Sequence, residues 1–291
     1  MHWIYVVILA AVQGLTELLP VSSSAHVIVT AELLHENMST PANALLLVML
    51  HTGTMFAVIV YFWRQWVDTF FASWEAFCRF AKMIFVASFL SGVVGYPVIL
   101  LVERVLSHGN HHAVIEALFH KLNWIAPALA AGGILILWAG LREVRNPNTQ
   151  PGTHHREIAW RQAVVMGIIQ GFAIPFRGFS RSGSTISAGL LADGERVPVE
   201  SFSFAMAVAI TPLAIARELY RLLRANAHAG VHTNLATALA PSLLGMTCAF
   251  FAGILALKWL SKWLEQGRWY LFGIYCLAAS VVVMLLYMRG W

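Results

Sequence analysis

The sequence predicts an all-α polytopic membrane protein made of two inverted-topology repeats, each a re-entrant helical hairpin followed by three transmembrane helices. Three observations predict it: the composition, six long apolar segments, and two apolar regions that are broken in the same way. Of the 291 residues, 59% are hydrophobic and 11% are charged, whereas soluble domains are about 45–50% apolar and about 25% charged. So few charges cannot cover a 32.2 kDa globule, and most of the surface is expected to face lipid.

The net charge of +5 does not indicate a nucleic-acid partner, because the 19 Lys and Arg lie mostly in short loops between apolar runs. That distribution is typical of membrane anchoring. The three cysteines form neither a disulfide framework nor a metal-binding spacing. The charged residues within apolar regions therefore become the informative ones.

Six segments are apolar and long enough to cross a bilayer, which takes roughly 20 residues. They are Ala42–Trp63, Met83–Val102, Ile125–Leu141, Ser201–Ala216, Ala238–Leu257 and Trp269–Met288. The third and fourth are short, so their helices are expected to extend into flanking polar residues.

Two further apolar regions, Trp3–Leu34 and Ala163–Ala192, are interrupted in the middle. The first is broken by a proline followed by three serines at 20–24, and the second by a stretch rich in Gly, Ser and Arg at 175–183. Each arm has about a dozen apolar residues, which suits one arm of a re-entrant hairpin. A single kinked helix is the alternative, disfavoured by the proline and the charged residues.

The two broken regions resemble each other and divide the chain into repeats. Val12-Gln13-Gly14-Leu15 corresponds to Ile169-Gln170-Gly171-Phe172, and each is followed by a serine cluster and then by three spans. We therefore predict a first repeat at 1–141, with its hairpin at 3–34, and a second at 161–291, with its hairpin at 163–192. A hydrophilic linker, 142–160, joins them within one membrane domain.

Counting the crossings predicts the topology. Three crossings per half force the second half to insert upside down, so that the two broken tips meet near the midplane. The linker face carries eleven cations: Arg64, Arg79, Lys82, Arg142, Arg145, Arg156, Arg161, Arg196, Lys258, Lys262 and Arg268. The other face carries six: Arg104, Lys121, Arg217, Arg221, Arg224 and Arg289. The positive-inside rule then places the linker in the cytoplasm and both termini outside.

The first break contains the residues expected to carry chemistry. Glu17 lies at membrane depth, where a carboxylate is costly unless it is paired or functional. Gln13 lies four residues earlier on the same helical face, so the two could bind a hard divalent cation or hold a water. Ser22, Ser23, Ser24 and His26 follow, a hydroxyl cluster and an imidazole suited to nucleophilic and acid/base roles. Taken alone, a serine cluster would more often be a helix cap.

The second break supplies the opposite charge through Arg177 and Arg181. Its glycines and hydroxyls are the groups that approach phosphate oxygens closely, and a following helix N-terminus adds positive potential. The residues that we assign to substrate binding come from both breaks: Gln13, Ser22, Ser24, Arg177, Gly178, Ser180, Ser182 and Thr185. His51 interrupts an apolar span, where it either lines the cavity or makes a helix contact.

Two motifs resemble the undecaprenyl-diphosphate phosphatase family of the bacitracin-resistance type. They are Gln13-x-x-x-Glu17-x-x-Pro20-x-Ser22-Ser23-Ser24-Ala25-His26 and Gly178-Phe179-Ser180-Arg181-Ser182-Gly183-Ser184-Thr185, with Phe202-Ser203-Phe204 downstream. The resemblance covers nearly the whole chain. In two places this sequence departs from the family pattern: Arg177 stands where the family has proline, and the stretch 194–196 is one residue tighter.

The resemblance implies a multi-pass enzyme of the bacterial inner membrane with its active site open to the periplasm. Such an enzyme removes the terminal phosphate of a C55 polyprenyl diphosphate with a divalent cation (Mg²⁺ or Ca²⁺), in peptidoglycan biosynthesis and bacitracin resistance. It further implies that Glu17 and Gln13 serve the metal or a water, and that His26 acts as acid or base. Ser23 would be the nucleophile, with Arg181, Ser180 and Thr185 on the diphosphate.

Several alternatives stay open at this point. Attack by Ser23 through a phosphoserine and direct attack by water fit the sequence equally well. A polyprenyl-phosphate flippase is the rival function, because inverted repeats with broken helices are transporter architecture, and an anion channel is a third. The expected partners are the lipid substrate and membrane lipid, and a homodimer is left open.

Overall fold

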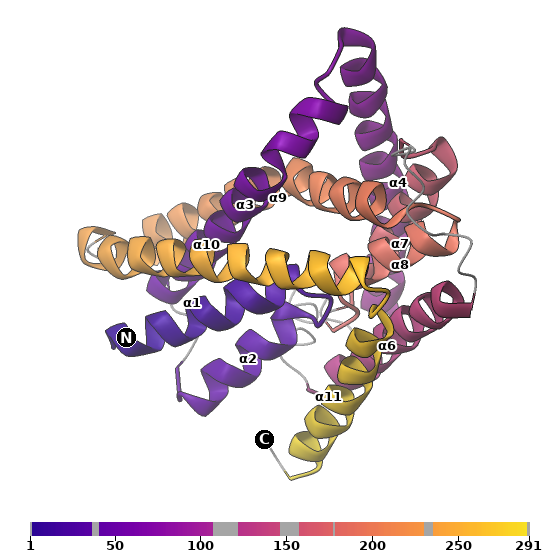
Figure 1. Ribbon diagram of the computed structural model, residues 1–291. Coiled ribbons are helices and arrows are strands. Elements are labelled where there is room, and N and C mark those ends of the chain that lie inside the picture. The colour runs from indigo at the N-terminus through magenta and orange to yellow at the C-terminus, as the bar shows by residue number, and fades with distance from the viewer. Residues whose placement is uncertain are drawn as a thin grey trace.

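A computed structural model describes residues 2–36, 41–106, 122–145, 157–176, 178–229 and 235–289. These residues form helices and no strand (Figure 1). The helices are α1 Trp3–Leu18, α2 Ser23–Leu33, α3 Pro41–Thr69, α4 Trp74–Leu106, α6 Leu122–Arg145, α7 Trp160–Ala173, α8 Arg181–Leu191, α9 Arg196–Ala229, α10 Leu235–Glu265 and α11 Tyr270–Met288. The predicted all-α class is confirmed.

Six helices are apolar and long enough to cross a bilayer, and each covers one of the predicted spans. They contain the segments Asn43–Thr69, Trp74–Val102, Trp124–Arg145, Arg196–Arg217, Leu239–Glu265 and Tyr270–Met288. Large apolar side chains such as Trp63, Phe85 and Trp138 are more than half exposed on them. Exposed aromatics on apolar helices are what a lipid-facing surface requires. The chain is therefore a multi-pass membrane protein, as predicted.

The two broken regions form short helices at the predicted places. The arms α1 and α2 have 16 and 11 residues, and α7 and α8 have 14 and 11. At 1.5 Å per residue, each is shorter than the roughly 30 Å hydrocarbon core. Within each pair the two arms pack against each other.

The backbone turns sharply at the start of the second arm in both pairs. Ser22 precedes α2 with φ 67°, and Ser180 precedes α8 with φ 54°. A serine rarely adopts the left-handed region, so both turns are held by their surroundings. The cap interpretation applies to one of them: Ser180 Oγ accepts the N–H of Gly183 at 3.2 Å, whereas the Ser22 hydroxyl makes no cap bond.

The first arms pack on long helices from the other part of the chain. α1 packs on α10 and α7 packs on α4, while α6 packs along α11 (Figure 1). A Cβ on Gly14 would lie 2.6 Å from the Ala249 carbonyl oxygen, and one on Gly171 would lie 2.8 Å from that of Ser91. Glycine is thus required at both positions, because the backbones approach within contact distance.

The largest buried cluster joins residues of both breaks to the long helices. Leu18 and Val21, from the first break, pack in the same cluster as Ile186 from α8 and Phe202 from α9. Trp269, at the start of α11, is fully buried and donates to the Ser187 hydroxyl at 2.9 Å. This packing places the two breaks side by side inside the helical assembly.

Candidate functional site

Glu17 lies at the end of α1 and gathers polar groups from three helices. Gln13 Nε2 donates to Glu17 Oε2 at 3.1 Å, as the four-residue spacing on α1 predicts. Ser23 Oγ, in the first turn of α2, donates to the same oxygen at 2.5 Å. The other oxygen, Oε1, accepts from Arg181 Nη2 at 3.2 Å. The carboxylate is therefore paired and hydrogen-bonded, as a charge away from water must be.

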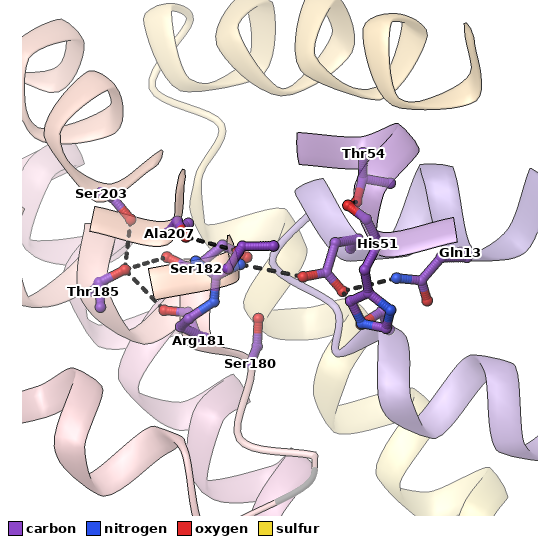
Figure 2. Close-up of polar contacts among 12 residues, drawn as sticks. Gln13, His51, Thr54, Ser180, Arg181, Ser182, Thr185, Ser203 and Ala207 are labelled. Carbon is purple, nitrogen blue, oxygen red and sulfur yellow. Dashed lines mark hydrogen bonds and ion pairs between the residues drawn. The ribbon is translucent and has the colours of Figure 1, made fainter. Parts of the chain in front are cut away.

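The Glu17–Arg181 contact joins the two breaks, 164 residues apart in sequence. Figure 2 shows Gln13 and His51 on one side of the site, and Arg181, Ser182 and Thr185 on the other. The Glu17 side chain is 17% exposed and that of Arg181 is 26% exposed, so the pair is mostly but not fully buried. Ser182 Oγ also reaches the Leu19 carbonyl at 3.4 Å. The predicted meeting of the two breaks is present.

The remaining groups of the second break surround the beginning of α8. Gly178 has φ 113°, and a Cβ there would lie 2.6 Å from the Ile125 carbonyl oxygen. The buried hydroxyl of Thr185 bonds that of Ser203 on α9 at 2.6 Å and donates to the Arg181 carbonyl at 2.8 Å (Figure 2). Arg181 is thus the first residue of a helix whose first turn is held by hydroxyl hydrogen bonds.

His26 lies on α2 one turn beyond Ser22, and its two ring nitrogens bond partners other than Glu17 and Ser23. Its Nδ1 lies 2.8 Å from the Ser22 carbonyl oxygen, and its Nε2 lies 2.6 Å from the Tyr275 hydroxyl on α11. Ser24, at the second position of α2, is half-buried. The acid/base role expected of His26 stays a prediction.

His51 is the histidine that lies beside the central carboxylate. Its Nε2 is 3.8 Å from Glu17 Oε2, and its Nδ1 bonds the Leu47 carbonyl at 2.8 Å. Of the two interpretations that the sequence left open for His51, the structure places it at the site. Tyr275 carried no signal in the sequence, because a tyrosine in an apolar span is ordinary. Arg177, which we assigned to substrate binding, lies outside the described residues.

The described residues include no cluster of three His, Cys, Asp or Glu side chains able to hold a metal. A cage of protein ligands is not needed for Mg²⁺, which usually takes one or two carboxylates together with substrate phosphate oxygens and waters. One carboxylate flanked by an amide and a hydroxyl fits that pattern. A cavity of about 380 Å³ lies among Gln65, Arg79, Glu157 and their neighbours, and it includes none of the site residues.

Similarity to known proteins extends over almost the whole chain. The chain is 49% identical over 289 residues to "Undecaprenyl-diphosphatase 2" of Acinetobacter baylyi, covering 98% of each protein. It is 34% identical to "Undecaprenyl-diphosphatase 2" of Burkholderia thailandensis, covering 99% of this chain and 96% of the relative. It is 32% identical to "Undecaprenyl-diphosphatase" of Desulfatibacillum aliphaticivorans, covering 98% and 99%. The profile described as "Bacitracin resistance protein BacA" matches residues 6–282, and the chain belongs to that family.

Proposed function

We propose that this chain is a membrane phosphatase that hydrolyses undecaprenyl diphosphate to the monophosphate and inorganic phosphate, and so recycles a cell-envelope lipid carrier. The names of its relatives support the substrate. The observation that carries the chemistry is a hydroxyl and a guanidinium bonded to the two oxygens of one carboxylate, the 2.5 Å Ser23 and 3.2 Å Arg181 contacts of Glu17. This arrangement supplies a nucleophile, a base and an anion clamp together.

The architecture that we propose is a pair of inverted repeats, 1–141 and 161–291, joined by the linker 142–160. Each begins with a re-entrant hairpin, α1–α2 or α7–α8. The reciprocal packing of α1 on α10 and of α7 on α4 supports the repeat, as do the left-handed serines at equivalent positions. Short arms that return to one side explain how polar backbone is tolerated at membrane depth.

The location that we propose is the bacterial inner membrane, with the linker in the cytoplasm and both termini and the site opening in the periplasm. The excess of loop Lys and Arg on the linker face supports this orientation. The orientation is tested by introducing single cysteines into the linker or beside a terminus and labelling them in intact cells with a thiol reagent that cannot cross the membrane. The homodimer stays a prediction, to be checked by light scattering in detergent.

In the reaction, Arg181 binds the diphosphate oxygens, together with backbone N–H groups at the start of α8. Ser23 Oγ attacks the terminal phosphorus while Glu17 takes its proton. The bond from that phosphorus to the bridging oxygen breaks, and the lipid monophosphate leaves with the proton that Glu17 had taken. Glu17, again ionised, then takes a proton from a water that attacks the phosphoserine. As the bond from phosphorus to Ser23 Oγ breaks, Glu17 returns that proton to Ser23, and inorganic phosphate leaves. Most of the acceleration is electrostatic, because phosphoryl transfer needs its charge neutralised.

A divalent cation, Mg²⁺ or Ca²⁺, belongs to this proposal. It would be held by Glu17 and Gln13 together with substrate oxygens and would neutralise phosphoryl charge. Chelation is therefore expected to lower the rate, and re-addition of the cation to restore it. Activity that persists unchanged with excess chelator removes the cation from the mechanism.

Phosphate release by the purified protein in detergent tests the function. Polyprenyl diphosphate with Mg²⁺ is expected to yield inorganic phosphate, since no second compartment is needed for hydrolysis. Release no greater than the protein-free background overturns the proposal. Rapid quench with substrate labelled in the terminal phosphate is expected to mark Ser23, and turnover without label assigns the attack to water.

A further inference from the structure

Tyr275 of α11 makes a hydrogen bond to the first break that the proposed reaction does not use. We infer that Tyr275 and His26 together form a brace that holds the Ser22 turn and thereby aims Ser23 at Glu17. The inference rests on the proposed function for its catalytic consequence. In this arrangement both Tyr275 and His26 are positioning residues, and neither touches the reacting atoms.

The tautomer of His26 follows from its two partners. The Ser22 carbonyl oxygen only accepts hydrogen bonds, so the Nδ1 atom 2.8 Å away carries a proton and donates it. In the neutral ring Nε2 then has a lone pair, and the Tyr275 O–H donates to it at 2.6 Å. Both ring nitrogens are occupied, and the two rings are stacked at an interplanar angle of 15°. The imidazole has one orientation, and no nitrogen is left for a substrate.

The backbone turn at Ser22 needs hydrogen bonds from neighbouring groups to hold it. Its φ of 67° is in the left-handed region, and its own hydroxyl makes no cap bond to α2. The Ser22 carbonyl instead receives the backbone N–H of His26 at 3.4 Å and the imidazole at 2.8 Å. Ser23 is the next residue, and its hydroxyl meets Glu17 at 2.5 Å. A change in the turn therefore moves the nucleophile directly.

A second contact from α11 reaches the same turn independently. Cys276 Sγ lies 3.2 Å from the Pro20 carbonyl oxygen, so adjacent residues of α11 hold both sides of Ser22. Farther along α11, Val283 belongs to the same buried apolar cluster as Ala25 and Ile28 of α2. Tyr275 itself is 46% exposed, so its packing contribution is modest and its hydroxyl is the specific element. Two adjacent residues of α11 thus hold the first break in place through hydrogen bonds.

Kinetic measurements on Tyr275→Phe test the brace, because this change keeps the stacked ring and removes only the hydroxyl. We expect kcat to fall about tenfold, the usual effect of losing a supporting hydrogen bond, with KM within about twofold. Tyr287→Phe, on the same helix and similarly exposed at 44%, is the matched control and should retain wild-type kinetics. A wild-type kcat for Tyr275→Phe overturns the inference.

Substitutions of His26 separate positioning from proton transfer. Asparagine can present an N–H to the Ser22 carbonyl but cannot act as an acid or base, so His26→Asn should retain far more activity than His26→Ala. Adding Tyr275→Phe to His26→Ala should lower kcat no further, because the phenol acts through the ring. Equal inactivity of the Asn and Ala variants assigns His26 to proton transfer and refutes the brace.

A readout without turnover keeps this inference distinct from the proposed function. In lipid-embedded protein labelled with ¹⁵N-histidine, the resonance removed by His26→Asn should show a protonated Nδ1 and an accepting Nε2. Tyr275→Phe should shift that Nε2 resonance, and Tyr287→Phe should not. An unmoved resonance refutes the brace even in an active phosphatase, whereas a shift in a protein that releases no phosphate supports the brace and refutes the function.

Discussion

Replacing Glu17 with glutamine is expected to lower kcat at least a hundredfold and leave the protein folded. The change keeps the shape of the side chain but removes the charge that Ser23 and Arg181 bond. Hydrogen bonds to a charged group contribute about 1.5–3 kcal/mol and neutral ones about 0.5–1.5. In the transition state, where Ser23 and Arg181 meet the reacting phosphate, weakening both contacts raises the barrier by about 2–3 kcal/mol, or roughly 30- to 150-fold. Loss of the base itself typically costs about 10²–10⁴-fold, which sets the larger expectation.

The fold is expected to survive because two of the three partners of Glu17, Arg181 and Gln13, can form other hydrogen bonds. Arg181 stays 26% exposed and can be hydrated, and the amide of Gln13 can turn to present its oxygen to the new glutamine. The midpoint of thermal unfolding in detergent should therefore stay within a few degrees. Glu32→Gln, an exposed carboxylate on α2 of the same hairpin, is the matched control and should leave both rate and midpoint unchanged.

Phosphate release from polyprenyl diphosphate measures the effect, alone and combined with Ser23→Ala. Because Glu17 and Ser23 act as a unit, the double variant should be no more than about tenfold slower than the worse single variant. A Glu17→Gln protein with more than a tenth of wild-type kcat contradicts the assignment of the base. Multiplicative losses in the double variant contradict the coupling of the two residues.

Three further outcomes are expected. Thr185→Val removes the 2.6 Å bond to Ser203 and should lower stability by about 1 kcal/mol, measured as the unfolding midpoint; an unchanged midpoint refutes the role of this bond. His51→Ala should lower kcat by less than about fivefold with little loss of stability, because the ring is 44% exposed and 3.8 Å from the carboxylate; inactivation by more than a hundredfold makes it a principal catalytic group. Gly178→Ala should destabilise the folded protein by about 1–3 kcal/mol, since φ is 113° and the added Cβ would clash with backbone. Gly92→Ala is the control: its added Cβ has no neighbour within 4 Å, so this change should be neutral or stabilising.

Much of the site was predictable because charge is scarce in this sequence. A carboxylate at 17 and a guanidinium at 181, each in a broken apolar region, had to find partners, and the symmetry of the two regions pointed each toward the other. The helical spacing of Gln13 and Glu17 predicted their contact directly. Local sequence was sufficient for the Gln13–Glu17 contact, whereas the Glu17–Arg181 pairing followed from the similarity of the two halves of the chain.

The histidines were not predictable in the same way. His26 follows the serines in sequence, but the direction of its ring is set by Tyr275, which lies 249 residues away. His51 approaches Glu17 because α3 packs beside α1 with one particular face. Hydropathy gives the existence of a span but not its rotation about its own axis, so the identity of the histidine beside Glu17 required the tertiary structure.

The pairing of Glu17 with Arg181 has a consequence for how the protein is made. Ribosomes add about 5–20 residues per second, so the 164 residues between the two take roughly 10 to 30 seconds to synthesise. During that interval the nascent α1 carries the Glu17 carboxylate without its Arg181 partner. The contact between Glu17 and Arg181 is therefore expected to form only after α8 has been synthesised, so the final packing of α1 and α2 is a late step in the biogenesis of the protein.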